Sequence, residues 1–268
     1  MTIRLVATDL DGTLLRSDGT VSARTARVLA ALQASGVVVV LVTGRPPRWM
    51  AEVGDVIGNA GVAICANGAL VYDMRSEALL SARLLEPALV RALTTRLRRG
   101  LPGLRFAVEY GLTFGREPEY EHGWAIGGAV RVEPVETLLD HPVAKLLARH
   151  PRLARDELLA RAVPLMGADA TVTSSSWESL LEISAFGVTK AATLAELAGS
   201  FGVAPREVMA FGDMPNDLEM LAWAGRPVAV ANAHPDLLAV AHEVTASNDD
   251  DGVALVLERL LAERTGAA

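Results

Sequence analysis

The segment Asp9-Leu10-Asp11-Gly12-Thr13-Leu14 follows directly on an apolar run at residues 3–8. The run predicts a buried first strand, and the ligands of open α/β sheets bind beyond the carboxyl ends of the strands. Asp9 and Asp11 could both face such a crevice, because Gly12 gives the backbone the freedom to bend there. One carboxylate could then attack a substrate while the other exchanges protons, and a hard cation such as Mg2+ would relieve their repulsion.

The same segment has a plainer interpretation, as a solvated aspartate-rich turn with a capping role. Its sequence does not fit a calcium-binding EF-hand loop, which needs oxygen ligands at further fixed positions and a terminal Glu. Leu14, Leu15 and Arg16 follow where such a loop requires other residues. The choice between a turn and a reactive pair therefore depends on what the other strand ends carry.

Strand and helix signals alternate in the first and last thirds of the chain. In the first third, strands are predicted at residues 3–8, 37–42 and 62–66, and helices at residues 22–32 and from Pro46-Pro47 onward. In the last third, helices are predicted at residues 189–200, 215–224, 235–241 and 252–264, and strands at residues 208–211 and 227–231. This alternation predicts a parallel sheet with right-handed crossovers.

The middle of the chain has a different pattern. Helical patterns at residues 87–99 and 155–162 stand among short extended runs at residues 104–110, 129–132, 170–174 and 180–183. This order predicts an α+β insertion between two halves of one core. We therefore expect an α/β protein with a Rossmann-like parallel-sheet core from residues 1–81 and 186–268, and an inserted α+β domain at residues 82–185.

Composition narrows the class of protein. Of the 268 residues, 51% are hydrophobic and 4% aromatic, which suits buried parallel strands covered by Ala- and Leu-rich helices. The formal net charge of -7 disfavours nucleic-acid binding, because affinity for a phosphate backbone needs clustered Lys and Arg. Cys65 lies in an apolar run and is expected to be buried rather than nucleophilic. The sequence has neither a signal-peptide layout nor a run of roughly 18 apolar residues, so we expect a cytoplasmic protein without a membrane partner.

Polar residues also stand at other predicted strand ends and at a helix start. Thr43-Gly44-Arg45 combines a hydroxyl, a flexible amide and a guanidinium at a strand–helix junction, which suits an anion. Gly212-Asp213-Met214-Pro215-Asn216-Asp217 again places acids where a buried strand meets a helix, and Asp213 could ligate a cation near Asp9. Lys190 lies at a predicted helix start, where its charge is unfavourable for the helix dipole, so we expect a negative group nearby.

Each segment by itself also has a purely structural explanation. Thr43 could cap a helix beside a surface Arg, Asp213 and Asp217 could cap a helix and compensate its dipole, and Lys190 could be exposed. Together, however, the segments carry Asp, Asp, Thr, Lys, Asp, Asn and Asp in an order suited to binding phosphate and metal.

In this order the segments resemble the four motifs of the haloacid dehalogenase superfamily, specifically its Cof-like subfamily IIB. The segment beginning at Asp9 looks like the first motif, Thr43-Gly44-Arg45 like the second, Lys190 like the third and residues 212–217 like the fourth. Cys65-Ala66-Asn67-Gly68-Ala69 is similar to that subfamily's Asn-Gly-Ala segment near the active site. The resemblance covers essentially the whole chain and implies that the insertion is a C2B-type cap, which determines substrate specificity.

The resemblance implies a phosphoric monoester hydrolase that works in two steps. Asp9 would attack phosphorus and form an aspartyl-phosphate, while Asp11 would protonate the leaving oxygen and then deprotonate the hydrolytic water. Mg2+ would be held by Asp9, by the backbone carbonyl of Asp11 and by Asp213. An aspartate at position 11 fits the phosphatases of the family and argues against dehalogenation.

The resemblance also implies roles for the remaining residues. Thr43 and Lys190 would bind the phosphoryl group, and Lys190 would neutralise Asp9. Asn216 and Asp217 would orient the metal-bound waters and Lys190. The further substrate-binding candidates are Gly44, Arg45, Asn67 and Asn216.

The cap would close over the core and select a small phosphorylated metabolite, by resemblance a sugar phosphate. Candidate contacts on the cap are Glu109, Tyr110, Tyr120, His122, Trp124, Trp177 and Glu178. One alternative is a phosphotransferase or phosphomutase that passes the phosphoryl group to a second substrate. Another is a catalytically silent, metabolite-binding regulator, against which the intact motif residues argue. The sequence predicts neither the metabolite nor the oligomeric state.

Overall fold

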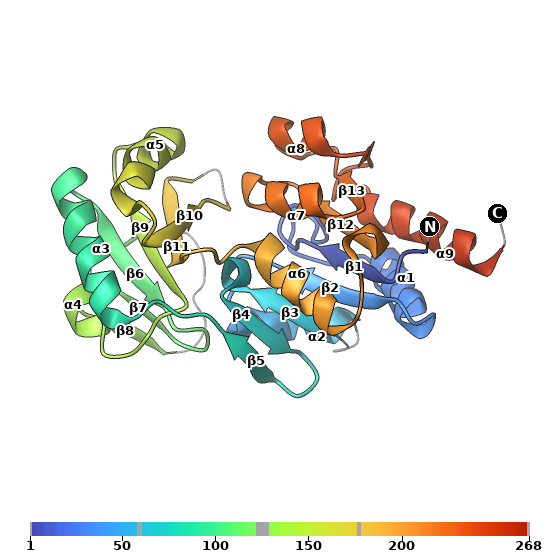
Figure 1. Ribbon diagram of the computed structural model, residues 1–268, viewed down its shortest axis with the longest axis horizontal. Helices are drawn as coiled ribbons and strands as arrows, with labels where there is room; N and C mark the ends of the chain where they lie inside the picture. The colour runs from blue at the N-terminus through green and yellow to red at the C-terminus, as the bar shows by residue number, and fades with distance from the viewer. Residues whose placement is uncertain (1, 58–60, 122–128, 176–177, 267–268) are drawn as a thin grey trace.

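The computed structural model describes residues 2–57, 61–121, 129–175 and 178–266. Within these residues the strands form an eight-stranded sheet and a six-stranded sheet. The two sheets belong to two lobes that lie side by side, and both chain termini lie at the far end of the larger lobe (Figure 1). We call the lobe with the larger sheet the core and the other lobe the cap.

The core sheet is mostly parallel. Its strands, in spatial order, are β14 (Glu243–Val244), β13 (Arg226–Ala229), β12 (Val208–Gly212), β1 (Leu5–Thr8), β2 (Val38–Val42), β3 (Val62–Cys65), β4 (Leu70–Asp73) and β5 (Ala78–Ala82). Neighbours from β14 to β3 run parallel, whereas β4 and β5 add an antiparallel edge. The carboxyl ends of β12, β1 and β2 therefore meet at one edge of the sheet.

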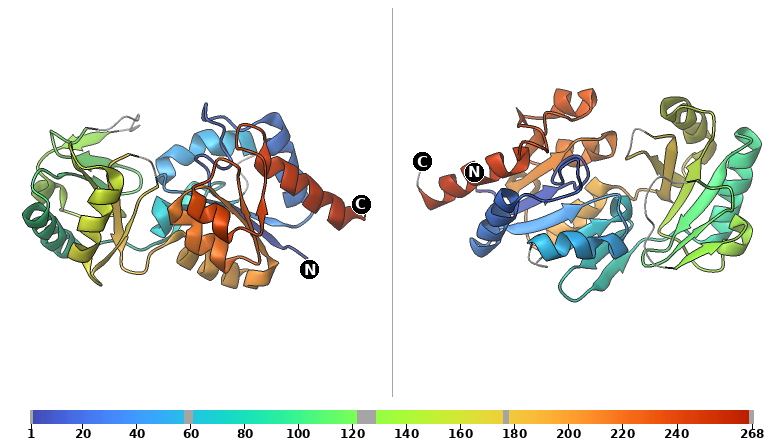
Figure 2. Two further views of the ribbon diagram at one scale, coloured as in Figure 1. Left: turned by 90° about the horizontal axis from the view of Figure 1, so that it is seen from above. Right: turned by 180° about the vertical axis from the view of Figure 1, so that it is seen from behind.

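Helices cover both faces of the core sheet (Figures 1 and 2). The core helices are α1 (Ala23–Ala34), α2 (Met50–Ile57) and α9 (Gly252–Thr265) on one face, α6 (Lys190–Ser200) and α7 (Leu218–Trp223) on the other, and α8 (Pro235–Val240) beside α7. Short 3-10 helices span Pro47–Trp49, Ala66–Gly68, Pro205–Glu207 and Pro215–Asp217. All four residues of β1 are buried, because helices pack on both faces of the sheet. This architecture confirms the predicted α/β fold.

The cap is an α+β lobe inserted between β5 and α6. Its strands, in spatial order, are β10 (Ala170–Thr173), β11 (Leu180–Ala185), β9 (Lys145–Arg149), β6 (Arg105–Glu109), β7 (Phe114–Arg116) and β8 (Val130–Val132). Its helices are α3 (Pro87–Gly100), α4 (Val135–Leu138) and α5 (Arg155–Met166). The predicted boundaries, at residues 81/82 and 185/186, stay a prediction.

The cap sheet has two chemically different faces because side chains alternate along a strand. One face packs on α3 and α5 through an apolar cluster that includes Phe106, Leu146 and Ile183. The alternate positions carry Glu109 and Lys145, which are cross-strand partners on β6 and β9, and Glu182 on β11. The second face therefore combines these charged residues with a smaller apolar cluster that includes Leu147 and Leu180.

Several elements differ from the prediction, which included none of β5, β7, β9, β14 and α4. Strand β9 occupies the middle of the cap sheet, although Lys-Leu-Leu-Ala-Arg consists of good helix formers. Pairing with β11 on one side and β6 on the other overrides that propensity. The helix predicted at residues 215–224 is a 3-10 turn, Pro215–Asp217, followed by the short helix α7.

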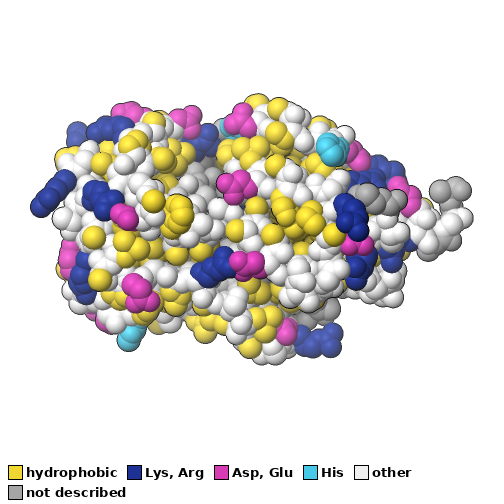
Figure 3. All heavy atoms as spheres, viewed as in Figure 1, with side chains coloured by type: hydrophobic (Ala, Val, Ile, Leu, Met, Phe, Trp, Pro, Cys, Tyr) yellow, Lys and Arg dark blue, Asp and Glu magenta, His cyan; other side chains and the backbone are white. Residues whose placement is uncertain are grey.

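The surface and the helices show two further features. On the face seen in Figure 3, basic and acidic side chains are interspersed rather than gathered by sign. Among the described residues, every helix is too short or too polar to cross a bilayer.

Candidate active site

The motif residues predicted from the sequence meet at the carboxyl edge of the core sheet. Asp9 follows β1, Thr43 follows β2 and Asp213 follows β12, and these three strands are neighbours. Lys190 is the first residue of α6, whose N-cap Thr189 accepts a hydrogen bond from the backbone of Ala192. Segments that are far apart in sequence thus bring their side chains to one place.

Lys190 lies between two buried carboxylates. Its Nζ donates hydrogen bonds of 2.6 Å to Oδ1 of Asp9 and of 2.6 Å to Oδ1 of Asp217. All three side chains are buried. The negative group expected near Lys190 is therefore the pair Asp9 and Asp217.

Asp213 also contacts the first motif. The hydroxyl of Thr13 donates a hydrogen bond of 2.9 Å to Oδ1 of Asp213. Gly12 has φ +78°, and a Cβ on it would lie 2.3 Å from Oδ2 of Asp213. Glycine at position 12 thus serves both the bend after β1 and the close approach of this carboxylate.

Burial and mutual repulsion disturb the titration of this cluster. Burial raises the pKa of Asp9 well above its usual value; the charge of Lys190 lowers it, whereas Asp217 and Asp213 raise it further. Burial, reinforced by Asp217, raises the pKa of Asp213 to about 7. Burial lowers the pKa of Lys190, but the carboxylates of Asp217 and Asp9 outweigh it and raise that pKa overall. The cluster therefore holds an excess of negative charge that a cation would relieve.

The residues fit a hard divalent cation. One carboxylate oxygen from each of Asp9, Asp213 and Asp217 lies within 4.8 Å of the others. Asp217 is already engaged, because its Oδ1 accepts from Lys190 and its Oδ2 accepts from the backbone N–H groups of Asp213 and Met214. Asp9 and Asp213 are thus the better ligands. The buried Oδ1 of Asn216 accepts no hydrogen bond from the described residues, which suits an acceptor for a metal-bound water.

Asp11 and Arg45 lie together at the mouth of the site. Arg45 donates to both carboxylate oxygens of Asp11, from Nε at 2.8 Å and from Nη2 at 2.5 Å. The side chain of Asp11 is 56% exposed. Thr43 is buried beneath this pair, and its hydroxyl oxygen accepts from the backbone N–H of Arg45.

Asn67 links the core to the cap. It adopts a left-handed backbone conformation, with φ 57°. Its Oδ1 accepts from Nδ2 of Asn216, and its own Nδ2 donates to the hydroxyl of Thr173 on β10, each over 3.2 Å. The chain from Asn216 through Asn67 to Thr173 therefore joins the fourth motif to the cap sheet.

A cavity of about 380 Å³ opens between the core and the cap above the motif residues, and we call it the cleft. Its floor includes Asp9, Lys190 and Asp213. Its cap wall includes Glu109, Phe114, Lys145, Leu147, Glu178, Leu180 and Glu182, and the core adds Gly44, Arg45, Arg48, Trp49, Met214 and Asn216. Predicted reactive groups and cap side chains therefore share one space.

The predicted cap contacts divide into three groups. Glu109 and Glu178 line the cleft. Tyr110 and Tyr120 are not among the residues that line the cleft: the hydroxyl of Tyr110 donates to the backbone of Leu138, and Tyr120 is buried against Phe114. Aromatic side chains thus fill the cap interior as well as its surface. His122, Trp124 and Trp177 lie outside the described residues.

The sequence prediction missed Arg48, Lys145 and Glu182. Arg48 forms a 2.5 Å ion pair with Glu109 across the lobes. Lys145 forms a 2.5 Å ion pair with Glu182 and donates to the backbone carbonyl of Gly44 over 2.9 Å. One signal in the sequence could have identified such residues: a single charged residue inside an otherwise apolar run, as in Leu180-Leu181-Glu182-Ile183.

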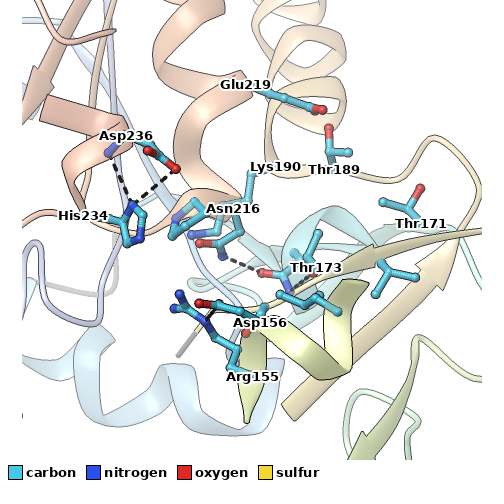
Figure 4. Close-up of a pocket in the computed structure, with 15 residues that line it drawn as sticks. Arg155, Asp156, Thr171, Thr173, Thr189, Lys190, Asn216, Glu219, His234 and Asp236 are labelled. Carbon is cyan, nitrogen blue, oxygen red and sulfur yellow. Dashed lines mark hydrogen bonds and ion pairs between the residues drawn. The ribbon is translucent and has the colours of Figure 1, made fainter. Parts of the chain in front are cut away.

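A second cavity, of about 510 Å³, shares Lys190 and Asn216 with the cleft. Figure 4 shows its labelled side chains coming from both lobes: Arg155, Asp156, Thr171 and Thr173 from the cap, and Thr189, Asn216, Glu219, His234 and Asp236 from the core. Asn67 also lines this second cavity, together with its two hydrogen-bond partners Asn216 and Thr173.

An α/β core with an inserted cap, acids at its strand ends and a lysine at a helix start define a class of hydrolase. A family model described as haloacid dehalogenase-like hydrolase matches residues 6–257. The chain belongs to this family.

Relatives of known description agree. An HMP-PP phosphatase of Cronobacter sakazakii is 32% identical over 241 residues, which cover 88% of this chain and 87% of the relative. A 5-amino-6-(5-phospho-D-ribitylamino)uracil phosphatase of Bacillus subtilis is 28% identical over 255 residues, covering 94% and 93%. The predicted enzyme class, a phosphatase of this family, is confirmed.

Solved structures share the fold. A haloacid dehalogenase-like hydrolase from Bacteroides thetaiotaomicron is 27% identical and superposes with a TM-score of 0.79, covering 97% of this chain and 100% of that one. A subclass IIB sugar phosphatase has the same fold, with a TM-score of 0.80 at 22% identity, covering 96% and 98%. The family model confirms the predicted family, and these structures confirm its fold.

Proposed function

We propose that the chain is a Mg2+-dependent phosphatase that hydrolyses a small phosphorylated metabolite, such as a sugar phosphate, through an aspartyl-phosphate on Asp9. The observation that carries the proposal is the buried contact between Lys190 and Asp9 at the floor of a cleft, with Asp213 beside them. Such a site combines a nucleophile, a cation for the phosphoryl group and carboxylates for a metal.

The two carboxylates of the first motif divide the chemistry. Asp9 attacks phosphorus, the bond from phosphorus to the leaving oxygen breaks, and Asp11 gives that oxygen its proton. Asp11 then takes a proton from water, which attacks the aspartyl-phosphate and releases phosphate and free Asp9. The surroundings support this division, because Asp9 is buried and fixed by Lys190, whereas Asp11 is exposed at the cleft mouth.

The other residues hold the phosphoryl group and the metal. When bound, Mg2+ would be held by Asp9, Asp213 and the backbone carbonyl of Asp11 and would neutralise charge on the phosphoryl group. Lys190 balances the charge of Asp9 and of the phosphoryl oxygens, and the buried hydroxyl of Thr43 donates to one of them. Asp217 holds Lys190 in place, and Asn216 offers its Oδ1 to metal-bound water.

The cap, which we assign to residues 82–185, selects the leaving group. Gly44, Arg45 and Asn67 contribute to the substrate site from the core, because the first two line the cleft and Asn67 is bonded to Asn216. The names of the two phosphatase relatives support a small phosphorylated metabolite as the substrate.

The test is phosphate release from a panel of phosphorylated metabolites, with Mg2+ and with EDTA. We expect release that depends on Mg2+ and on Asp9, with inorganic phosphate as the end product. Transfer of the phosphoryl group to a second metabolite in the mixture would indicate a phosphotransferase. Binding of a phosphorylated ligand without any release would contradict the proposal and favour a regulator.

A further inference from the structure

We propose that Lys145 and Glu182 of the cap select a neutral, hydroxyl-bearing leaving group and disfavour one that carries a second anionic group. The inference rests on the phosphatase activity proposed above, because it concerns the same cleft. It assigns a specificity role to two side chains that lie outside the four sequence motifs.

The pair lies directly above the second motif. Nζ of Lys145 is 2.5 Å from Oε1 of Glu182 and donates to the carbonyl of Gly44 over 2.9 Å. A Cβ on Gly44 would lie 3.6 Å from the same Oε1. Both side chains line the cleft together with Asp9 and Lys190. A leaving group bound to the phosphoryl group must therefore extend past this pair.

The pair keeps capacity for further hydrogen bonds. Among the described residues, the ammonium of Lys145 donates to Gly44 and Glu182, whereas it carries three N–H bonds. Oε2 of Glu182 accepts from the backbone N–H of Ser175 over 2.8 Å, and each carboxylate oxygen can accept two bonds. A hydroxyl both donates and accepts, so it matches an ammonium and a carboxylate that stand side by side.

Stability alone does not explain the pair. Lys145 is 4% and Glu182 is 3% exposed, and both lie on strands whose opposite face is apolar. A buried ion pair usually stabilises a protein no better than apolar side chains of similar volume. The cost of burying these charges is therefore explained by a ligand that they contact.

The charges around the pair disfavour a second anion. Glu109 and Glu178 line the same wall, and Glu109 already engages Arg48 over 2.5 Å. A second phosphate or a carboxylate on the leaving group would approach Glu182 and Glu109 and would have to compete with them for Lys145 and Arg48. Glu178, which is paired with Arg149, adds a third carboxylate to the wall. A neutral leaving group meets no such repulsion, and Phe114, Leu147 and Leu180 offer apolar surface to its carbon skeleton.

The experiment compares substrates that differ in one group. The hydroxylated esters are fructose 6-phosphate, ribose 5-phosphate and glycerol 3-phosphate. Fructose 6-phosphate is compared with fructose 1,6-bisphosphate, and glycerol 3-phosphate with 3-phosphoglycerate, because each of these partners carries a second anionic group. Ribose 5-phosphate is a further hydroxylated ester without such a partner, and phenyl phosphate is the ester without hydroxyls. The readout is kcat/KM from phosphate release for the wild type, Glu182→Gln and Lys145→Met.

For the wild type we expect fructose 6-phosphate and glycerol 3-phosphate, whose leaving groups are neutral, each to exceed the partner with a second anionic group at least about tenfold in kcat/KM. In each variant, kcat/KM for the best hydroxylated ester should fall about 10- to 100-fold, as expected for the loss of a hydrogen bond to a charged group. The fall in kcat/KM for phenyl phosphate should be at least about five times smaller. Glu117→Gln is the matched control. It changes another buried cap carboxylate, which accepts from the backbone of Phe106 away from the cleft, so selectivity should stay as in the wild type.

Folding of the variants is checked by thermal melting. The double variant Lys145→Met/Glu182→Leu leaves neither charge of the pair unmatched, so it should fold and show the same loss of selectivity.

Equal losses of kcat/KM on the hydroxylated ester and on phenyl phosphate would overturn the inference, because the pair would then only hold the cap closed. A preference for the doubly anionic partners, or turnover of phenyl phosphate but of no hydroxylated ester, would also overturn it. A wild type that releases phosphate from none of the esters would instead refute the phosphatase proposal, and the inference with it.

Discussion

Nζ of Lys190 lies 2.6 Å from Oδ1 of Asp9, although 181 positions separate the two residues in the chain. The same ammonium holds Asp217 at 2.6 Å. A buried cation thus stands between the proposed nucleophile and a carboxylate that is anchored to the backbone of Asp213 and Met214. Because these charges interact with one another away from water, substitutions among them should change catalysis and stability to different extents.

Replacing Asp9 with Asn should abolish turnover while the protein stays folded. The amide has the shape of the carboxylate but is a poor nucleophile, and Lys190 keeps its bond to Asp217. We expect kcat to fall more than about a thousandfold, with an unchanged circular dichroism spectrum. Hydrolysis close to the wild-type rate would exclude Asp9 as the nucleophile.

Replacing Lys190 with Met should destabilise the protein as well as inactivate it. The change leaves Asp9 and Asp217 buried without their cation, which typically costs about 3–5 kcal/mol in the free energy of unfolding. Urea denaturation in EDTA measures this loss. The control is Arg24→Met, which removes an exposed ion pair with Glu258 and should cost less than about 1 kcal/mol. Equal stability of the two variants would contradict a buried charge cluster.

Replacing Asp11 with Asn should slow the reaction by an amount that depends on the leaving group. Loss of a general acid typically costs about 10²- to 10⁴-fold, and an alkyl phosphate should suffer most because its leaving oxygen needs a proton. With 4-nitrophenyl phosphate, the first step needs less help, whereas hydrolysis of the aspartyl-phosphate still needs a base. An initial burst of nitrophenolate should therefore appear. The same loss for both esters, without a burst, would count against the acid–base role.

Much of the fold and of the catalytic floor could be predicted from the sequence. Asp9, Thr43 and Asp213 each follow a buried strand, and parallel strands bring such positions to one edge of a sheet. Lys190 could be predicted because its charge at a helix start conflicts with the helix dipole. These signals are local, so a single sequence carries them.

The cap wall could not be predicted in the same way. Lys145 belongs to β9, a segment of helix formers that becomes a strand through pairing with β11 and β6. Glu182 and Arg48 acquire their partners through contacts between distant segments. The order of the cap strands decides which side chains face one another, and a single sequence does not give that order. For the same reason the sequence does not show that Tyr110 and Tyr120 lie away from the cleft.

The protection given by Mg2+ should grow as the pH rises. Burial raises the pKa of Asp9 and, to about 7, that of Asp213, so the metal-free folded protein binds more protons than the unfolded chain. The contribution of Asp213 is therefore fully present below its ordinary pKa of 3.8 and is lost as the pH rises through about 7. Mg2+ binds the deprotonated carboxylates and should offset this loss.

Melting temperatures at pH 5 and pH 8, each with Mg2+ and with EDTA, measure this effect. The increase produced by Mg2+ should be larger at pH 8, and Asp213→Asn should reduce the difference between the two pH values. Full phosphatase activity in EDTA, or a Mg2+ effect that is larger at pH 5, would contradict the metal assignment.

Replacing Gly12 with Ala should weaken metal binding specifically. The added Cβ would lie 2.3 Å from Oδ2 of Asp213 and would push this carboxylate away. Gly19→Ala is a matched control, because Gly19 has φ +81° against +78° for Gly12, and a Cβ there would meet no described atom within 4 Å. Both variants should be destabilised by about 1–2 kcal/mol, because alanine is strained in a left-handed backbone conformation. The Mg2+ concentration for half-maximal activity should rise about tenfold or more for Gly12→Ala alone, and equal values would contradict the contact.

Every residue assigned to the reaction lies in the core, while the cap enters as one uninterrupted insertion between β5 and α6. A cap from a relative could therefore be grafted at these two crossings without rebuilding the reaction centre. The graft would have to supply an acceptor for Arg48 and a donor for the carbonyl of Gly44, as Glu109 and Lys145 do here. Exchange of a single contiguous block of sequence would then redirect the enzyme to another metabolite.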